Sequence, residues 1–440
     1  MSAAAAPAEE QKKKRRIITW KNELCSEYRS KKIAALIARF VLNVEANNIM
    51  ARWNELRFIG ELGSGAYAKV HEFADLDSNE RVAFKLMRRD CYKRWLNDVD
   101  LQQIDSFEAK LALFLTQNLL PVWPHFCDTF AYAIVPTRFT IRGIFEHKEE
   151  YFTIATLMRI AESTLDIRLS TYTCSMITVN AALSTIVQTL LTIALLARLG
   201  ITHHDLRIEN VLLAGVDSRS SIKYVVDGHA PIVIKTHGVL AMVGDFGVAT
   251  QQDFWQLEQP HGDPRARAGT NVAHFYSNDD DEHDLFKTRA DIKLLLVKAR
   301  IWDLHGLRFT KLTTNERDFV QFFTSLLAHL EGIRTTVADI ECAKVAVRNL
   351  TNYLVAALEL VLERCAQTSE EFVQLALDIC DQQFVARHFG ATDLFADEST
   401  GIATTFVLPD ISACSLLRSK LLLQLSQRPT LTGICVCSDC

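Results

Sequence analysis

The sequence predicts an α+β fold in which a small β-rich lobe is followed by a larger, mainly helical lobe. Two runs rich in strand-forming residues, 61–73 and 81–87, lie around glycines near the start of the chain. From Asn180 onward, apolar residues recur mostly at helical spacing. With 440 residues, 49% of them hydrophobic, the chain is long enough to bury a substantial core.

Net charge limits the classes of binding partner, and cysteine content indicates the cellular compartment. The formal net charge of −5 is small for 440 residues, so the field of the whole molecule gives no reason to expect nucleic acid or an acidic membrane as a partner. The basic cluster at 12–16 leaves two interpretations open: a nuclear signal or weak phosphate-binding arm, and a solvated run without a role. Eleven cysteines and no secretory signal predict a reduced intracellular compartment, cytoplasm and/or nucleus.

Four segments are predicted along the chain. Residues 1–50 form an N-terminal extension with a disordered basic start and then an amphipathic helix, and 54–158 form the smaller lobe. Residues 159–430 form the larger lobe, in which the most apolar stretch, 181–201, is interrupted by polar residues and predicts a buried helix, not a membrane span. Residues 431–440 form a frayed tail, because Cys435, Cys437 and Cys440 lack a fourth ligand at zinc-site spacing.

A pair of glycines, Gly63 and Gly65, falls at a turn between two predicted strands. Backbone amides at such a turn can approach a phosphate closely, although glycines in a hairpin more often serve only the turn. The candidate nucleotide-contacting residues here are Leu62, Gly63, Ser64, Gly65, Ala66 and Val70.

A lysine follows on the next predicted strand, in Val82-Ala83-Phe84-Lys85. A lone lysine in a strand is usually a solvated edge residue. A functional role for Lys85 therefore requires an acidic residue that pairs with it. Glu108, on the helix predicted next, is the best acidic candidate, with an ordinary surface glutamate as the alternative. Ala83 and Lys85 join the candidate nucleotide site.

The strongest local pattern follows the apolar stretch directly, in His203-His204-Asp205-Leu206-Arg207-Ile208-Glu209-Asn210. The spacing from Asp205 to Asn210 suits one loop that brings a carboxylate and an amide to one phosphate site. Further on, the hydrophobic run 239–243 leads into Gly244-Asp245-Phe246-Gly247. An isolated Asp-Phe-Gly turn would be unremarkable, so the order of all four motifs carries the prediction.

In that order the motifs resemble the glycine-rich loop, V-A-I-K strand, H-R-D-L-x-x-x-N loop and D-F-G turn of the protein kinase family, with Ala68 in place of the third glycine. The resemblance implies a bilobal protein-kinase-like fold, ATP and Mg²⁺ as cofactors, and serine/threonine hydroxyls of proteins as substrates. It implies that Lys85 contacts the phosphates and that Asn210 and Asp245 bind the metal. Asp205 would be the catalytic carboxylate, and Arg207 would replace the usual lysine near the γ-phosphate.

The chain departs from that family at several points. His204 stands where regulated kinases have the arginine that pairs with a phosphorylated activation loop, so we expect activity without that phosphorylation. The long segment before Asp245 predicts an inserted hairpin that turns at Asp227-Gly228. This insertion resembles those of kinases encoded by large double-stranded DNA viruses, which would place the protein in a host cell. Asp291 resembles the buried aspartate that braces the catalytic loop, with a helix N-cap as the competing explanation.

Three questions stay open on the sequence alone. A small-molecule kinase of the aminoglycoside or choline kinase type shares the loop and the metal-binding aspartate, although the glycine turn with Lys85 favours a protein substrate. A pseudokinase that only binds partners is the non-enzyme alternative, and the retained Lys85, Asp205, Asn210 and Asp245 argue against it. The residues before Asn210 favour serine/threonine, whereas Arg207 also occurs at that place in some tyrosine kinases.

Overall fold

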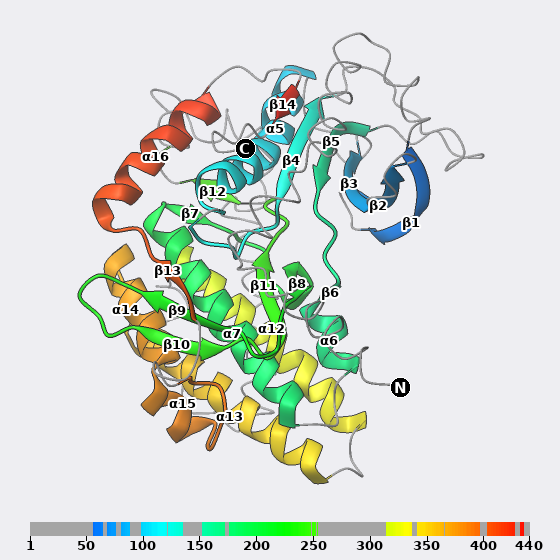
Figure 1. The fold of residues 1–440 in the computed structure, drawn as a ribbon. Coiled ribbons are helices and arrows are strands. Elements are labelled where there is room, and N and C mark those ends of the chain that lie inside the picture. Colours follow the sequence, from blue (N-terminus) through cyan, green and yellow to red (C-terminus); the bar gives the residue numbers. More distant parts are fainter. Residues whose placement is uncertain are drawn as a thin grey trace, which may run out of the picture.

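The computed structural model describes residues 56–64, 68–75, 81–88, 98–120, 122–134, 152–171, 176–247, 249–251, 253, 314–336, 341–364, 366–396, 403–426 and 432–434. Several predicted features lie outside these ranges: the N-terminal extension with its basic cluster, Gly65, Ala66, Asp291 and the three C-terminal cysteines. Within the described residues the fold is mixed α+β, as predicted. Figure 1 shows a six-stranded sheet at one end and most of the helices at the other.

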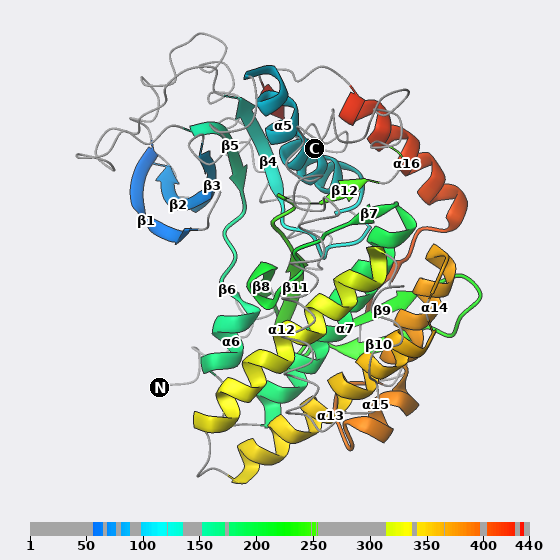
Figure 2. The same cartoon turned by 180° about the vertical axis from the view of Figure 1, so that it is seen from behind.

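The six-stranded sheet has the order β1-β2-β3-β5-β4-β14. Its strands are β1 (Leu56–Ser64), β2 (Ala68–Asp75), β3 (Arg81–Arg88), β4 (Thr129–Ile134), β5 (Phe152–Met158) and β14 (Thr432–Ile434). The two predicted strand-rich runs are thus confirmed as β1 to β3. Helix α5 (Asp98–Asn118) packs on this sheet beside β4 and β5 (Figure 2).

The register of the sheet places candidate residues in one row. Gly63 is opposite Val70, Val70 is opposite Lys85, and Lys85 is opposite Thr156 on β5. Directly opposed residues on antiparallel strands share a face of the sheet, so the side chains of Val70, Lys85 and Thr156 project to the same side. The neighbouring Phe84 projects to the other side, where it meets the ring of Phe73 edge-on at 5.0 Å. Alternation along β3 therefore separates an apolar face from the face that carries Lys85.

The helical part is built around α7 (Met176–Arg198). The other helices are α6 (Leu165–Thr171), α12 (Thr314–Thr336), α13 (Glu341–Arg364), α14 (Ser369–Cys380), α15 (Gln382–His388) and α16 (Ile411–Ser426). Leu190, Ala194 and Leu195 on α7 are fully buried, which confirms that the most apolar stretch is a core helix. Polar side chains on α7 are satisfied internally, as where Gln188 donates to the carbonyl of Val239 at 3.1 Å.

Two helices in the described part of the chain are long and apolar enough to cross a membrane, judged by length and composition alone. In the segment Val179–Arg198, 89% of the apolar window is buried inside the protein, and in Lys344–Arg364 the share is 56%. Core helices of globular proteins have the same length and composition.

Short strands form smaller sheets beside α7. Strands β6 (Ser163–Thr164), β8 (Val211–Gly215) and β11 (Val239–Val243) form one sheet, in which β8 separates β6 and β11. Strands β9 (Ser221–Val225) and β10 (Ile232–Lys235) form the predicted inserted hairpin, and Gly228 takes a φ of 79° at its turn. The sequence did not predict β13 (Ala403–Val407), which pairs in parallel with β9.

A buried hydrogen-bond chain ties the inserted hairpin to β11. Tyr224 on β9 donates its hydroxyl to His125 Nε2 at 2.8 Å, and His125 donates from Nδ1 to the carbonyl of Ala241 at 2.8 Å. Burial lowers the pKa of His125 to about 4, so the ring stays neutral and keeps one donor and one acceptor. The backbone carbonyl of His125 also accepts from Val243 N–H, which fixes the strand that leads to Asp245.

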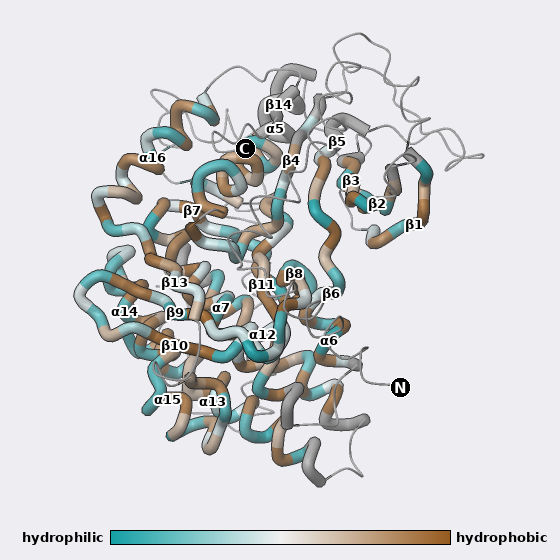
Figure 3. Tube along the Cα trace, in the orientation of Figure 1, coloured by the Kyte–Doolittle hydropathy of each residue, from teal (hydrophilic) through white to brown (hydrophobic). Residues whose placement is uncertain are grey.

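The C-terminal elements differ from the predicted division of the chain. Helix α16 returns to pack against α5, and β14 pairs with β4 at the edge of the six-stranded sheet (Figure 1). Figure 3 shows that apolar and polar residues are mixed along α16. Residues 411–426 and 432–434 therefore lie partly with the sheet that the sequence assigned to the smaller lobe, because tertiary packing and not chain order decides what they contact.

Candidate active site

Lys85 lies between two carboxylates at the junction of the sheet and the helical part. Its Nζ atom is 2.5 Å from Glu108 Oε1 and 2.5 Å from Asp245 Oδ1. The lysine comes from β3, the glutamate from α5 and the aspartate from the turn after β11. The predicted pairing of Lys85 with Glu108 is present. Glu108 is therefore not an ordinary surface glutamate, which was the alternative.

The charges of this triangle depend on one another. Burial lowers the pKa of Lys85, but the carboxylates of Asp245 and Glu108 outweigh burial and raise it above its usual value. The attraction of Lys85 lowers the pKa of Asp245, whereas burial raises the pKa of Glu108 against the pull of Lys85. With both acids ionised the triangle carries one excess negative charge, which favours a cation beside it.

The turn that carries Asp245 requires small neighbours. Asp245 has a φ of 60°, a conformation that non-glycine residues adopt rarely and mostly at functional sites. A Cβ atom on Gly244 would meet Leu212 Cδ1 at 3.0 Å. A Cβ atom on Gly247 would meet the carboxylate oxygens of Asp245 at 3.3 Å and of Glu108 at 3.4 Å. Glycine at position 247 lets the two carboxylates sit close to the backbone, and glycine at position 244 leaves room for Leu212.

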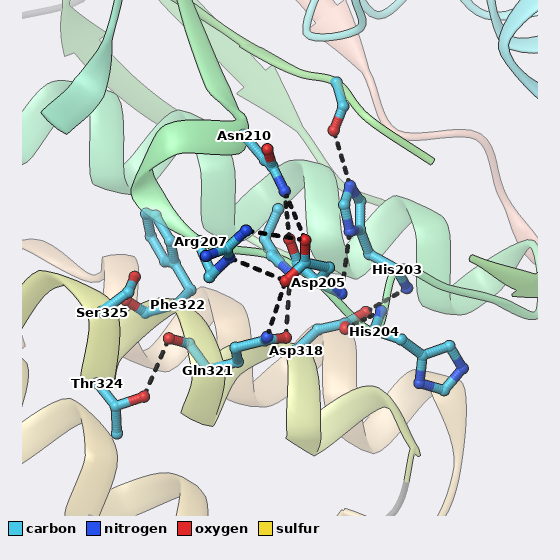
Figure 4. A network of polar contacts seen from close by, with 12 residues as sticks. His203, His204, Asp205, Arg207, Asn210, Asp318, Gln321, Phe322, Thr324 and Ser325 are labelled. Atoms are coloured by element: carbon cyan, nitrogen blue, oxygen red, sulfur yellow. Dashed lines mark hydrogen bonds and ion pairs between the residues drawn. The ribbon is translucent and has the colours of Figure 1, made fainter. Parts of the chain in front are cut away.

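Asp205 is held by the residues that follow it in the same loop (Figure 4). Arg207 Nε lies 2.9 Å from Asp205 Oδ1, and Asn210 Nδ2 donates to Asp205 Oδ2 at 3.2 Å and to its carbonyl at 2.7 Å. These contacts need the short 3-10 helix Ile208–Asn210, which folds Asn210 back over Asp205. The predicted convergence of Asp205, Arg207 and Asn210 is therefore observed.

Backbone contacts join this loop to the Asp245 turn. The amide of Gly244 donates to the carbonyl of Asn210 at 3.0 Å, and His203 donates from Nε2 to the carbonyl of Gly244 at 2.9 Å. The ring of His203 also packs against Phe246 at 5.0 Å. Burial lowers the pKa of Arg207, but nearby carboxylates, with Asp205 first and Asp245 among them, outweigh it and raise it. The two clusters therefore form one site.

Sequence reasoning missed two residues of α12 that hold this loop. Asp318 accepts the backbone N–H of His203 at 2.7 Å and of His204 at 2.8 Å. Gln321, one turn later, accepts from Leu206 N–H at 3.1 Å and points its Nε2 at Asp205 Oδ1, 3.4 Å away (Figure 4). Asp318 has the bracing contacts expected of Asp291. The i, i+3 spacing on an apolar helix was the available signal, but no local pattern shows which loop that helix faces.

Asp318 provides a test of this brace through the pH dependence of stability. Burial raises the pKa of Asp318 to about 6, opposed by His203. A carboxyl whose pKa is raised by folding stabilises the fold below its ordinary pKa, and this contribution is lost as pH rises through about 6. Between pH 4 and pH 8 we expect wild type to lose about 2 kcal/mol of unfolding free energy that Asp318→Asn does not lose.

Urea unfolding of both proteins across that range measures the difference. Asp227→Asn, at the exposed turn of the inserted hairpin, is the matched control and should follow wild type. Parallel pH curves for wild type and Asp318→Asn would show that Asp318 is not the titrating brace.

The oxygen atoms of the site fit Mg²⁺. The side chain of Asp245 is 49% exposed although one of its oxygens contacts Lys85, and Glu108 Oε2 is buried without a hydrogen-bond partner in the protein. Because Asn210 Nδ2 donates to Asp205, its Oδ1 is the atom left for a metal ion. No cluster of three or more His, Cys, Asp or Glu side chains suited to a metal occurs among the described residues. Mg²⁺ is usually held by one or two protein oxygens together with phosphates and water.

The candidate nucleotide residues line the row that leads to Lys85. Val70 and Ala83 share its face of the sheet, whereas Leu62 and Ser64 lie exposed near the end of β1. A Cβ atom on Gly63 would meet no atom within 4 Å, so protein atoms leave open space there. Gly65 and Ala66 lie outside the described residues.

Comparison with known proteins adds little to this geometry. No family model matches the chain, and no curated protein matches it. A crystal structure of a kinase domain aligns with a TM-score of 0.28 and 18% identity, over 48% of this chain and 54% of that domain. The chain thus spans about half the length of the kinase domain that it matches. A likeness this weak supports no conclusion about fold or activity.

Proposed function

We propose that the chain is an ATP- and Mg²⁺-dependent protein kinase that transfers the γ-phosphoryl group to serine or threonine hydroxyls. One observation carries the proposal: the Lys85, Glu108 and Asp245 triangle is joined to the Asp205 and Asn210 pair through the backbone of Gly244. The six-stranded sheet with α5 then corresponds to the smaller lobe of a kinase-like fold, and the helices around α7 to the larger lobe.

The proposed roles follow from the chemistry of phosphoryl transfer, in which positioning and charge neutralisation supply most of the catalysis. Lys85, held by Glu108, binds the α- and β-phosphates, and Asp245 and Asn210 hold Mg²⁺. Mg²⁺, when bound, neutralises charge on the phosphate oxygens. Asp205 orients the attacking hydroxyl and accepts its proton, and Arg207 offers positive charge to the γ-phosphoryl group.

Two sequence features support the proposed substrate class. The glycine turn followed by Lys85 favours proteins over small alcohols as substrates. The residues before Asn210 favour serine and threonine over tyrosine. An intracellular location, in the cytoplasm or nucleus, is part of the proposal, and a viral origin would make the compartment that of the host cell. Cys127, Cys380 and Cys414 are buried free thiols, in keeping with a reduced compartment.

The deciding experiment measures Mg²⁺-dependent transfer of labelled phosphate from ATP to a panel of basic and acidic proteins, beside a panel of small alcohols. We expect labelled protein, with phosphoserine or phosphothreonine after hydrolysis. Labelled alcohols alone would replace the proposal with a small-molecule kinase, and phosphotyrosine would correct the hydroxyl class. ATP binding without transfer to any acceptor would identify a pseudokinase.

A further inference from the structure

Helix α16 and strand β14, residues 411–426 and 432–434, form what we call the C-terminal strap. In the middle of α16, Arg418 donates from Nε and Nη2 to Asp253 Oδ2, at 3.0 Å and 2.5 Å. Asp253 belongs to the segment that follows Asp245, directly after β12 (Thr250–Gln251). Gln251 donates to the same oxygen of Asp253 at 3.2 Å. The strap therefore holds the start of the segment after the metal-binding turn.

On its other side, Arg418 lies against the turn that follows α7. A Cβ atom on Gly200, just after α7, would meet Arg418 Nη2 at 3.3 Å, and Gly200 has a φ of 66°. Gly200 immediately precedes β7 (Ile201–Thr202), which pairs with β12 and leads into the Asp205 loop. Arg418 thus lies where the Asp205 loop and the Asp245 segment run side by side.

The C-terminal end of α16 contacts the helix that carries Glu108. Lys110 on α5 donates to the carbonyl of Leu425 at 3.4 Å, and Gln424 donates to the carbonyl of Lys110 at 3.4 Å. Leu421 and Leu425 are buried in the core. Because Lys110 lies two residues after Glu108, these contacts fix the turn of α5 that places Glu108 against Lys85.

The strap continues into the sheet that carries Lys85. In β14, Gly433 is opposite Tyr132 on β4, Tyr132 is opposite Thr156 on β5, and Thr156 is opposite Lys85 on β3. One continuous row of the sheet therefore runs from the strap to the lysine. The strap therefore contacts α5, which carries Glu108, lies in the same row of the sheet as Lys85, and binds Asp253, eight residues after Asp245.

His204 also contacts the segment that Arg418 holds. It shares a hydrogen bond of 2.7 Å with the hydroxyl of Thr250, on the same short strand that precedes Asp253. A hydrogen bond to a hydroxyl differs from the ion pair that holds a phosphorylated loop. Arg418 supplies a guanidinium to that segment instead, and its partner is a carboxylate encoded in the chain.

We propose that Arg418 is a positioning residue and that the C-terminal strap keeps the Lys85 triangle closed without phosphorylation of the segment after Asp245. This inference rests on the proposed kinase function and deepens it by naming how the site is regulated. Three kinds of contact hold the strap: a partly exposed ion pair in the middle of α16, buried leucines in its second half, and an edge strand paired with the sheet.

The test compares phosphatase-treated full-length wild type with Arg418→Met, Asp253→Asn and the charge exchange Arg418→Asp with Asp253→Arg. The matched control is Lys420→Met, which removes an exposed cation two residues further along α16. Phosphate transfer, Mg·ATP affinity and thermal unfolding are measured for each. We expect both single variants to lose roughly five- to tenfold in kcat/KM while staying folded, the exchange to recover most of that loss, and the control to match wild type.

Three results would overturn the inference. The single variants could match Lys420→Met, the charge exchange could be no better than either single variant, or phosphatase treatment could abolish wild-type transfer. The first two remove the ion pair from the mechanism, and the third gives its role to phosphorylation, while all three leave the kinase proposal standing. No transfer by wild type before or after treatment would overturn the kinase proposal and this inference together.

Discussion

Asp205→Asn is expected to lower phosphate transfer roughly 10²- to 10⁴-fold, the range over which general acid–base catalysis contributes. The amide has the shape of the carboxylate, and its single oxygen, placed where Oδ2 lies, can still accept from Arg207 Nη2 and Asn210 Nδ2, so the loop should keep its fold. It cannot accept the proton of the attacking hydroxyl. Because Lys85 and Asp245 are untouched, Mg·ATP affinity should change little, and the loss should appear in kcat.

Asp217→Asn is the matched control, since this carboxylate pairs with Arg219 in the loop between β8 and β9, away from the site. Single-turnover transfer and Mg·ATP titration of the three proteins separate the outcomes. Full transfer by Asp205→Asn would remove Asp205 from the catalytic role. An equal loss of ATP binding would show that the variant had disturbed the nucleotide site, not the proton acceptor.

Lys85→Met is expected to lower kcat/KM roughly 10²- to 10³-fold, the usual cost of removing one preorganised charge from an active site. It should also lower the free energy of unfolding by roughly 3–5 kcal/mol, because it leaves two close carboxylates without their shared cation. Lys85 opposes the rise that burial causes in the pKa of Glu108, so its removal raises that pKa further. A raised carboxyl pKa costs stability as pH rises, and the deficit should therefore be larger at pH 8 than at pH 5.

Lys69→Met is the matched control, because Lys69 lies on the neighbouring strand β2 opposite Leu86 and projects to the other face of the sheet. Urea unfolding at the two pH values and the transfer assay measure both effects. A Lys85→Met protein with wild-type stability at pH 8 would show that Glu108 and Asp245 do not repel each other as the geometry requires. Equal activity losses in the two variants would assign the effect to the sheet as a whole.

Local sequence patterns were sufficient where neighbours in the chain decide the structure. Strand-forming residues around glycines gave β1 to β3, the apolar stretch gave the buried helix α7, and an Asp-Gly pair gave the inserted hairpin. The loop from Asp205 to Asn210 closes on itself within six residues, so its motif sufficed to predict its contacts. The order of motifs even located Glu108, since the helix after β3 is the next element able to reach Lys85.

By itself the sequence determined the chemical groups of the site and the elements that carry them, because each motif is short and its geometry is local. Only the tertiary structure decided which distant elements brace them. Asp318 and Gln321 face the Asp205 loop because α12 packs across it, and Arg418 reaches Asp253 because α16 returns to α5. Contacts between residues more than a hundred positions apart depend on how whole helices pack, and no periodicity within one segment records which other segment it will meet.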